Sequence, residues 1–221
     1  MRGHATPGNS GVSQMARRWL VHVYNEPVSG RDEVKPAASG VKLTYEDFVL
    51  FPDDGKRHEL IDGEHYATPA PNAKHQAIVV NLTGMMWSYL QQHPGGRIFT
   101  APFDVVFSEF DVVEPDLLFI AGERKDQVLL KQHVRGAPDL VIEIGSPSTR
   151  KRDETIKRRL YERFGVSEYW VIDPELDTIK VYRRVDQRFV RVAELSLENG
   201  DVATTPLLPG LEMPLSTIFE N

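Results

Sequence analysis

The chain of 221 residues contains no cysteine. Disulfides, zinc–thiolate sites and cysteine nucleophiles are therefore excluded, and the composition is compatible with a reducing compartment. No apolar run approaches the roughly 20 residues that span a bilayer. The first residues also lack the long apolar stretch of a secretory signal. We expect a cytoplasmic protein that does not enter a membrane.

Two common catalytic signatures are missing as well. The sequence has no glycine-rich phosphate loop, and no serine lies in a nucleophile-elbow pattern with an evident histidine–acid partner. The net charge is −6, whereas general DNA-binding proteins are more often basic. Residues 150–163 nevertheless carry seven basic residues against three acids. That segment is either a solvated helix face or a surface that faces phosphates.

Composition divides the chain into two parts. Residues 1–40 are rich in glycine, serine, proline and charge and show no sustained period, so we expect a poorly ordered N-terminal extension. Residues 41–221 have the patterning of one folded domain. With 41% hydrophobic residues overall, the chain can bury a substantial core.

Local patterns predict most elements of this domain. Thr44 and Asp47 are a capping signal for a short helix that stops before Pro52, and Asp62–Gly63 is a favoured two-residue hairpin turn. Apolar side chains at helical spacing predict a long helix from about residue 73 to 92. Further strands are expected near residues 97–107, 112–120, 137–145 and 167–173, with a hairpin at 178–195, a polar and partly helical stretch at 123–135, and a helix at about 151–164.

The order of these elements indicates the fold class. The segment from Leu140 to Asp173 reads as strand, helix and strand, with the length of a right-handed βαβ crossover. A helix and several strands precede this unit. We therefore predict an α/β protein of the α+β type, with a central mixed sheet flanked by helices.

Two acids interrupt apolar strands. Asp116 lies in VVEPDLLFI and Glu143 in LVIEIG. Burying an unpaired charge costs several kcal/mol or more, but two acids on neighbouring strands form a site for a hard divalent cation. Pro115, which lacks a backbone donor, fits a strand end or a bulge that aims Asp116. The alternative is that both acids lie on exposed faces or pair with arginines.

Three other polar residues could belong to this site. Asp139 precedes Glu143 by four residues, roughly 13 Å along a strand, which favours a structural role at the start of the strand. Glu59, in the first hairpin, is either a third acid of the site or an ordinary exposed glutamate. His75, near the start of the long helix, is either an auxiliary site residue or a polar helix-end residue.

Lys157 is the candidate cation. It shares a helix face with Asp153 and Tyr161 at spacings of four residues. A lysine above a carboxylate–metal pair stabilises charge on a phosphate oxygen or orients the attacking water. The alternative is an ordinary surface pair with Asp153.

At these residues the chain resembles the Uma-two family, a large bacterial group of restriction-endonuclease-like proteins in the PD-(D/E)xK nuclease superfamily. The likeness runs in order over about residues 41–185. The matching segments are HELIDGE, PAPNAKHQ, APFDVVFS, VVEPDLLFI, GAPDLVIEIGSPST, KRRLYERFGVSEYWVIDP and IKVYRR.

The resemblance implies a restriction-endonuclease-like core and a set of site residues. Asp116 and Glu143 correspond to the two acids that hold the metal, and the Ile144 carbonyl adds an oxygen ligand. Glu59 corresponds to a further acid of the site. The superfamily pattern has lysine two residues after the second acid, where this chain has Gly145, and the resemblance points to Lys157 of the following helix as its replacement.

The implied function is that of a Mg²⁺- or Mn²⁺-dependent endonuclease that hydrolyses DNA phosphodiester bonds. Arg150, Lys151, Arg152 and Arg158 would contact the nucleic acid. A homodimer is expected, because many enzymes that act on duplex DNA use one site for each strand. The alternatives are a non-catalytic nucleic-acid-binding or assembly protein that keeps the fold, and a metal-dependent hydrolase of another phosphoester.

Overall fold

The structure is a computed structural model that describes residues 40–146 and 149–220. Most of its strands, between residues 57 and 196, form two large sheets. The expected extension over residues 1–40 lies outside the described residues, apart from Gly40. Every described residue belongs to the compact unit of residues 35–221. Among the described residues, none of the helices combines the length and apolar character that a membrane-spanning segment requires.

The larger sheet is mixed. In spatial order it contains β11 (Arg188–Ser196), β10 (Thr178–Val185), β9 (Glu168–Asp173), β8 (Leu140–Ile144), β6 (Leu117–Ala121) and β3 (Gly96–Thr100). Strands β8 and β9 run parallel, and the other neighbours are antiparallel. The predicted βαβ crossover is thus confirmed, because a parallel pair requires a helix-length connection.

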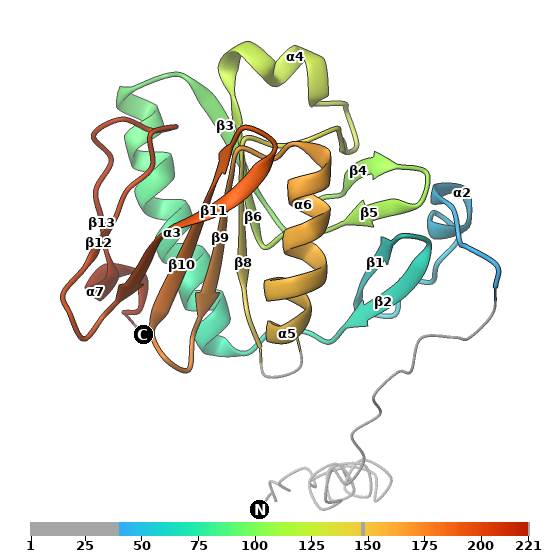
Figure 1. Cartoon of the computed structure of the whole chain (residues 1–221), viewed down its shortest axis with the longest axis horizontal. Helices are drawn as coiled ribbons and strands as arrows, with labels where there is room; N and C mark the ends of the chain where they lie inside the picture. Colours follow the sequence, from blue (N-terminus) through green and yellow to red (C-terminus); the bar gives the residue numbers. More distant parts are fainter. Residues whose placement is uncertain (1–39, 147–148, 221) are drawn as a thin grey trace, which may run out of the picture. The chain divides into compact units, whose positions relative to one another are not determined.

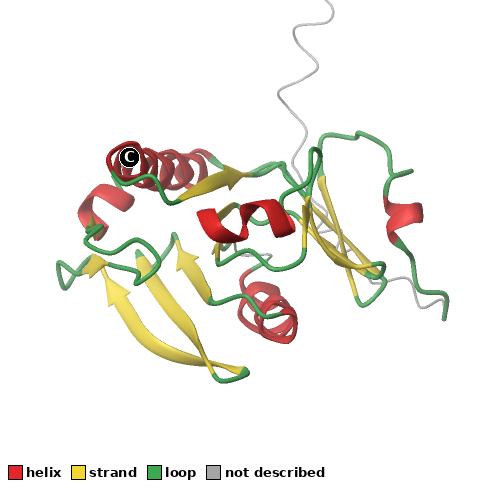
Figure 2. Ribbon diagram, turned by 90° about the horizontal axis from the view of Figure 1, so that it is seen from above, coloured by secondary structure: helices red, strands yellow, loops and turns green. Residues whose placement is uncertain are grey.

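The smaller sheet holds the first hairpin. Its spatial order is β2 (Glu64–Thr68), β1 (Arg57–Ile61), β5 (Asp111–Val113), β4 (Val105–Ser108) and β7 (Val134–Arg135). The turn between β1 and β2 has φ of 54° at Asp62 and 74° at Gly63, as a two-residue turn with positive φ requires. A further strand pair, β12 (Val202–Ala203) with β13 (Met213–Pro214), lies near the C-terminus. Figure 2 shows the strands of the two large sheets as separate groups.

The predicted strands at residues 97–107 and 112–120 are each divided between the two sheets. The first gives β3 and β4, and the second gives β5 and β6. Pro102 and Pro115 lie at the two breaks. Since proline cannot donate to a ladder, each strand ends there, and the chain crosses from one sheet to the other.

The helices follow the predicted pattern closely. The short helix α2 (Tyr45–Phe48) has the predicted capping box between Thr44 and Asp47, and α3 (Ala73–Gln92) has the predicted bounds. The polar stretch gives a 3₁₀ turn (Gly122–Arg124) and α4 (Lys125–Val128). The predicted helix at 151–164 consists of α5 (Arg150–Arg152), a π-helical turn (Asp153–Lys157) and α6 (Arg158–Phe164), and α7 (Leu215–Ile218) follows β13.

Two apolar cores cover the two faces of the larger sheet. One face, with Ile142 and Trp170, packs against α3 and the C-terminal residues. The other face, with Val141 and Tyr169, packs against α6 and side chains of the smaller sheet. Figure 1 shows α3 and α6 on opposite sides of these strands. Because side chains alternate along a strand, Glu143 points to the same face as Val141, toward α6.

The close approach of β3 to β6 gives the first prediction. A Cβ atom at Gly96 would lie 2.3 Å from the Phe119 ring and 2.6 Å from the backbone oxygen of Ile120. Gly96→Ala should therefore lower the free energy of unfolding by about 1–3 kcal/mol through overpacking. Gly84, in the middle of α3, has no atom within 4 Å of such a Cβ, so Gly84→Ala should raise it by about 1 kcal/mol. Urea unfolding of the two variants measures both changes in the free energy of unfolding. An equal change in the two variants would contradict the close packing of Gly96 against β6.

Candidate active site

The two strand acids lie at one end of the β6–β8 pair. Leu117 pairs with Ile142 and Leu118 with Val141 in an antiparallel register. One step further along this register, Asp116 stands opposite Glu143. Residues opposite each other across antiparallel strands have Cβ atoms about 4.5–5.5 Å apart, so the fold brings the two acids to the same place on one face of the sheet.

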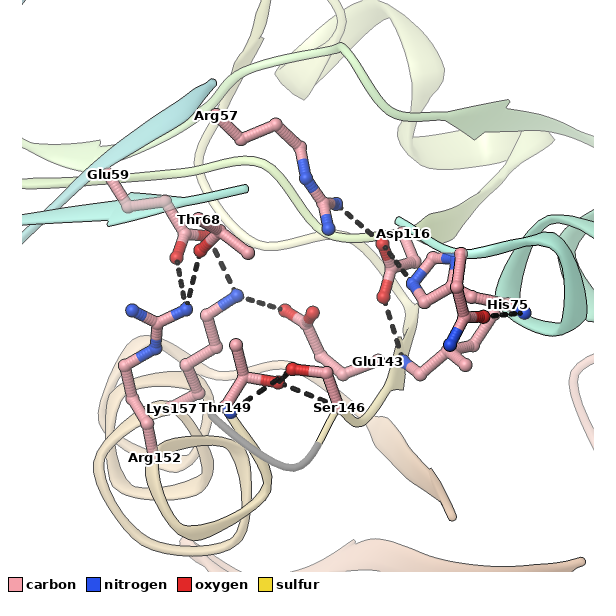
Figure 3. Close-up of polar contacts among 12 residues, drawn as sticks. Arg57, Glu59, Thr68, His75, Asp116, Glu143, Ser146, Thr149, Arg152 and Lys157 are labelled. Atoms are coloured by element: carbon pink, nitrogen blue, oxygen red, sulfur yellow. Dashed lines mark hydrogen bonds and ion pairs between the residues drawn. The ribbon is translucent and has the colours of Figure 1, made fainter. Parts of the chain in front are cut away.

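Asp116 is buried and ionised. Its Oδ1 accepts a hydrogen bond from Arg57 Nη1 at 2.5 Å and lies 3.2 Å from His75 Nε2, and its Oδ2 accepts the backbone N–H of Ile144 at 2.8 Å. Figure 3 shows Arg57 and His75 beside Asp116. Burial alone would raise the pKa of Asp116, but the nearby His75, Arg57 and amide N–H lower it to about 2.

The position of His75 follows from the sequence around it. The Asn72 side chain caps α3 by accepting the backbone N–H of His75 at 2.9 Å. That cap fixes the first helical turn, and His75 is 6% exposed. The histidine named as an auxiliary residue therefore lies against Asp116 rather than in solvent.

Glu143 and Glu59 share one lysine. Lys157 Nζ lies 2.9 Å from Glu143 Oε1 and 2.7 Å from Glu59 Oε1, and all three side chains are almost fully buried. The hydroxyl of Tyr161, one helical turn after Lys157, donates to Glu143 Oε1 at 2.5 Å. The alternative of an ordinary surface lysine at position 157 is wrong, because this ammonium group lies in the interior between two carboxylates (Figure 3).

Charge in this region is not balanced. Asp116, Glu143, Glu59 and Asp153 line one small hollow with Arg57, Arg152 and Lys157, which sets four carboxylates against three cations. Burial raises the pKa of Glu143, Lys157 opposes that rise, and Asp116, Asp153 and Glu59 add to it, so that the value is about 8. Burial lowers the pKa of Lys157, but the carboxylates of Glu143, Glu59 and Asp153 raise it above its ordinary value.

The four basic residues predicted to contact nucleic acid do not all face the hollow. Arg152 faces the hollow, where its Nη2 lies 3.6 Å from Glu59 Oε2 and donates to Thr68 Oγ1 at 2.8 Å. Arg150 pairs with Asp173 and Glu175 at 2.8 and 2.7 Å. Lys151 is exposed, and the Arg158 guanidinium lies 5.2 Å from the centre of the Tyr182 ring. Of these four cations, Arg152 is the one that lines the hollow.

Asp139 lies away from the hollow. Its carboxylate accepts the backbone N–H of Ala121 at 2.8 Å and a hydrogen bond from Arg124 at 2.7 Å. These contacts hold the strand start, as the spacing from Glu143 predicts.

Several residues of the hollow were not predicted as site residues. Arg57 is the most prominent, and the alternation of side chains along β1 could have identified it, because residues two apart share a face and Glu59 was already a candidate. Asp153 was named as a neighbour of Lys157 but not as part of the site. It lies with Lys157 in the π-helical turn, and both side chains are buried.

The comparisons with known proteins give two kinds of match. A family model described as "Uma2: Putative restriction endonuclease" matches residues 45–216. Among solved structures, the chain is similar to one titled a "putative nuclease belonging to DUF820" from Anabaena variabilis, with a TM-score of 0.67 and 23% identity, over 80% of this chain and 97% of that one. This likeness shows the fold, and the predicted restriction-endonuclease-like fold class is confirmed.

A second solved structure is much less similar. It is titled the type IIG restriction endonuclease BpuSI, with a TM-score of 0.36 and 12% identity, over 56% of this chain and 13% of that one. A likeness this low carries no argument about the chain. The comparison with curated proteins gives no match.

Proposed function

The chain belongs to the Uma2 family, and from that membership and the geometry of the hollow we propose that it is a metal-dependent endonuclease that hydrolyses DNA phosphodiester bonds. The observation that carries the proposal is the meeting of Asp116 and Glu143 across β6 and β8, with Lys157 between Glu143 and Glu59. Burying two acids and a lysine costs folding free energy through desolvation. Groups retained at such a cost are often part of a functional site.

The carboxyl groups of the hollow support the proposed Mg²⁺ or Mn²⁺ ion. Among the described residues, no group of three or more histidine, aspartate or glutamate side chains is arranged to hold a metal ion. Magnesium, however, usually takes one or two carboxylates and completes its shell with water and substrate phosphate. Asp116, Glu143 and Ile144 line the same hollow. The four carboxyl groups there outnumber the three cations, and a bound metal ion would supply the positive charge that lets Glu143 lose its proton.

The chain's own groups have distinct proposed roles. Asp116, Glu143 and the Ile144 carbonyl would hold the ion, which supplies Lewis-acid polarisation of the phosphate and a more acidic bound water. Lys157 would stabilise charge on a phosphate oxygen or orient the water. Arg152, whose planar guanidinium suits phosphate oxygens, would position the backbone of the substrate, and Glu59 would hold Lys157 and Arg152 in place.

The backbone at position 145 lies close to the neighbouring strand. A Cβ atom at Gly145 would lie 3.3 Å from the backbone oxygen of Ile172, and the Gly145 N–H donates to that oxygen at 2.8 Å. A side chain there would make a tight contact with that strand. Lys157 reaches Glu143 from the helix without crossing that space.

Plasmid cleavage tests the proposal. Supercoiled, relaxed, linear and single-stranded DNA are incubated with the full chain and Mg²⁺ or Mn²⁺, and EDTA and Glu143→Gln serve as controls. We expect metal-dependent cleavage that both controls abolish, and the ratio of nicked to linear product reports whether two sites act together, as the proposed homodimer requires. DNA binding that Glu143→Gln leaves unchanged, without cleavage of any substrate, would instead support a non-catalytic binding protein. Cleavage of small phosphoesters alone would support another hydrolase.

A further inference from the structure

A second, larger cavity adjoins the hollow and has no role in the chemistry described so far. This groove has a volume of about 810 Å³, within the 300–1,000 Å³ typical of small-molecule sites. Its walls come from α2, the segment that leads into β1, the first turns of α3, and the segment before β4. Arg57 and Asp116 line both the groove and the hollow, so a ligand in the groove would lie directly beside the metal-binding acids.

One wall of the groove is aromatic. Tyr45, Phe48 and Phe51 line it and are all partly buried. Aromatic side chains of this kind provide stacking surfaces for nucleobases. The same three side chains pack on the small core of Leu60, Val106 and Val112. The faces that they leave to the groove suit a ligand with a flat apolar surface better than a phosphate group.

The polar end of the groove carries unsatisfied hydrogen-bonding groups. Glu114 Oε2 and both ring nitrogens of His133 are buried and make no hydrogen bond within the part of the chain that the structure describes, although the Glu114 carboxyl group also hydrogen-bonds the Asp104 side chain. Asp104 lines the groove beside them. Buried polar atoms without partners are costly, so this end is suited to a ligand that brings its own donors and acceptors.

The charges of the side chains that line the groove indicate which part of a nucleotide it can accept. Asp104 and Glu114, whose side chains hydrogen-bond each other, offer a phosphate no positive charge. Arg57, which pairs with Asp116 at the border with the hollow, offers one. The N–H donors of a base edge suit carboxylate acceptors. An arrangement with the phosphate near Arg57 and the base in the groove satisfies both ends.

We propose that this groove binds one unpaired nucleobase of the DNA, next to the phosphate held in the hollow. The inference rests on the proposed nuclease function and adds a specificity site to it. In a duplex the donor edge is already paired, so the base must come from a single strand or be turned out of the helix. Guanine, with two adjacent N–H donors on its pairing edge, should be favoured over thymine, whose single donor lies between two carbonyl groups.

Saturation-transfer NMR on the full chain, in EDTA, tests the groove without any cleavage step. The probes are dGMP, dTMP and deoxyribose 5-phosphate, which lacks a base. We expect saturation of the base protons of dGMP with an affinity on the order of millimolar, at least about fivefold weaker binding of dTMP, and no competition from deoxyribose 5-phosphate. Equal competition by the sugar phosphate would overturn the proposal, since it would show that phosphate alone drives binding.

Variants locate the site. Phe51→Leu keeps an apolar side chain but removes the aromatic face, and it should weaken dGMP binding at least about fivefold, with thermal unfolding measured to establish that the variant is folded. The matched control is Trp87→Ala, which removes a ring that lines a different cavity, of about 440 Å³, and it should leave binding unchanged. Unchanged binding in folded Phe51→Leu contradicts the proposal. The plasmid assay tests the nuclease proposal separately. Cleavage without nucleotide binding would contradict only the proposed nucleobase site. Nucleotide binding without cleavage would support that site and count against the nuclease.

Discussion

Lys157→Met should reduce DNA cleavage by about 10²–10³-fold, the loss that follows removal of one preorganised charge-stabilising group. Methionine keeps the length of the side chain and removes its charge. The substitution also leaves Glu59 and Glu143 buried without their shared cation, and breaking a buried ion pair in this way costs about 3–5 kcal/mol. Single-turnover cleavage and urea unfolding measure the two effects on the same preparation.

A second substitution separates catalysis from folding. In the double variant Glu59→Gln with Lys157→Met, one uncompensated carboxylate is removed, so much of the lost stability should return while cleavage stays low. The matched control is Lys180→Met, because Lys180 also pairs with an acid, Glu154, at 2.6 Å, but at the partly exposed surface; it should change stability by less than about 1 kcal/mol. A folded double variant that cleaves DNA at the wild-type rate would remove Lys157 from the mechanism.

Much of the fold could be predicted because its local signals agree with its tertiary contacts. The capping box at Thr44, the hairpin turn at Asp62 and the bounds of α3 all follow from patterns a few residues long. The division of the strands between two sheets could not be predicted, although Pro102 and Pro115 mark the breaks. A proline shows where pairing stops, but not which strand the chain joins next.

The candidate site shows the same limit. Asp116 and Glu143 are visible in the sequence because each is a charge within an apolar strand. Arg57 is visible only indirectly, because it shares a strand face with the candidate Glu59 and the sequence alone does not show that this face turns inward. The resemblance points to Lys157, and the structure shows how this position can serve: Asp153 and Lys157, one turn apart on the helix, are both buried.

Asp116→Asn and Glu143→Gln should abolish cleavage to similar extents but differ in stability. Each removes one of two proposed carboxylate ligands and with it several kcal/mol of transition-state stabilisation, so cleavage should fall by about 10³-fold or more at 1.36 kcal/mol per tenfold. Calorimetric titration with Mn²⁺ should show loss of binding in both variants. That readout does not depend on activity and distinguishes a metal ligand from a residue that acts only on the substrate.

The difference in stability follows from the partners of each acid. The pKa of Asp116 is lowered to about 2 from 3.8, so its carboxylate stabilises the fold above pH 4 and that contribution is lost as the pH falls toward 2. Asparagine should therefore cost about 2–4 kcal/mol at pH 7, because Arg57 loses its ion-pair partner. Glu143 has a raised pKa and shares Lys157 with Glu59, so glutamine should change stability by less than about 1 kcal/mol. Urea unfolding of both variants at pH 7 decides this: equal losses, or a larger loss in Glu143→Gln, would mean that Asp116 is not the acid on which the local charge network depends.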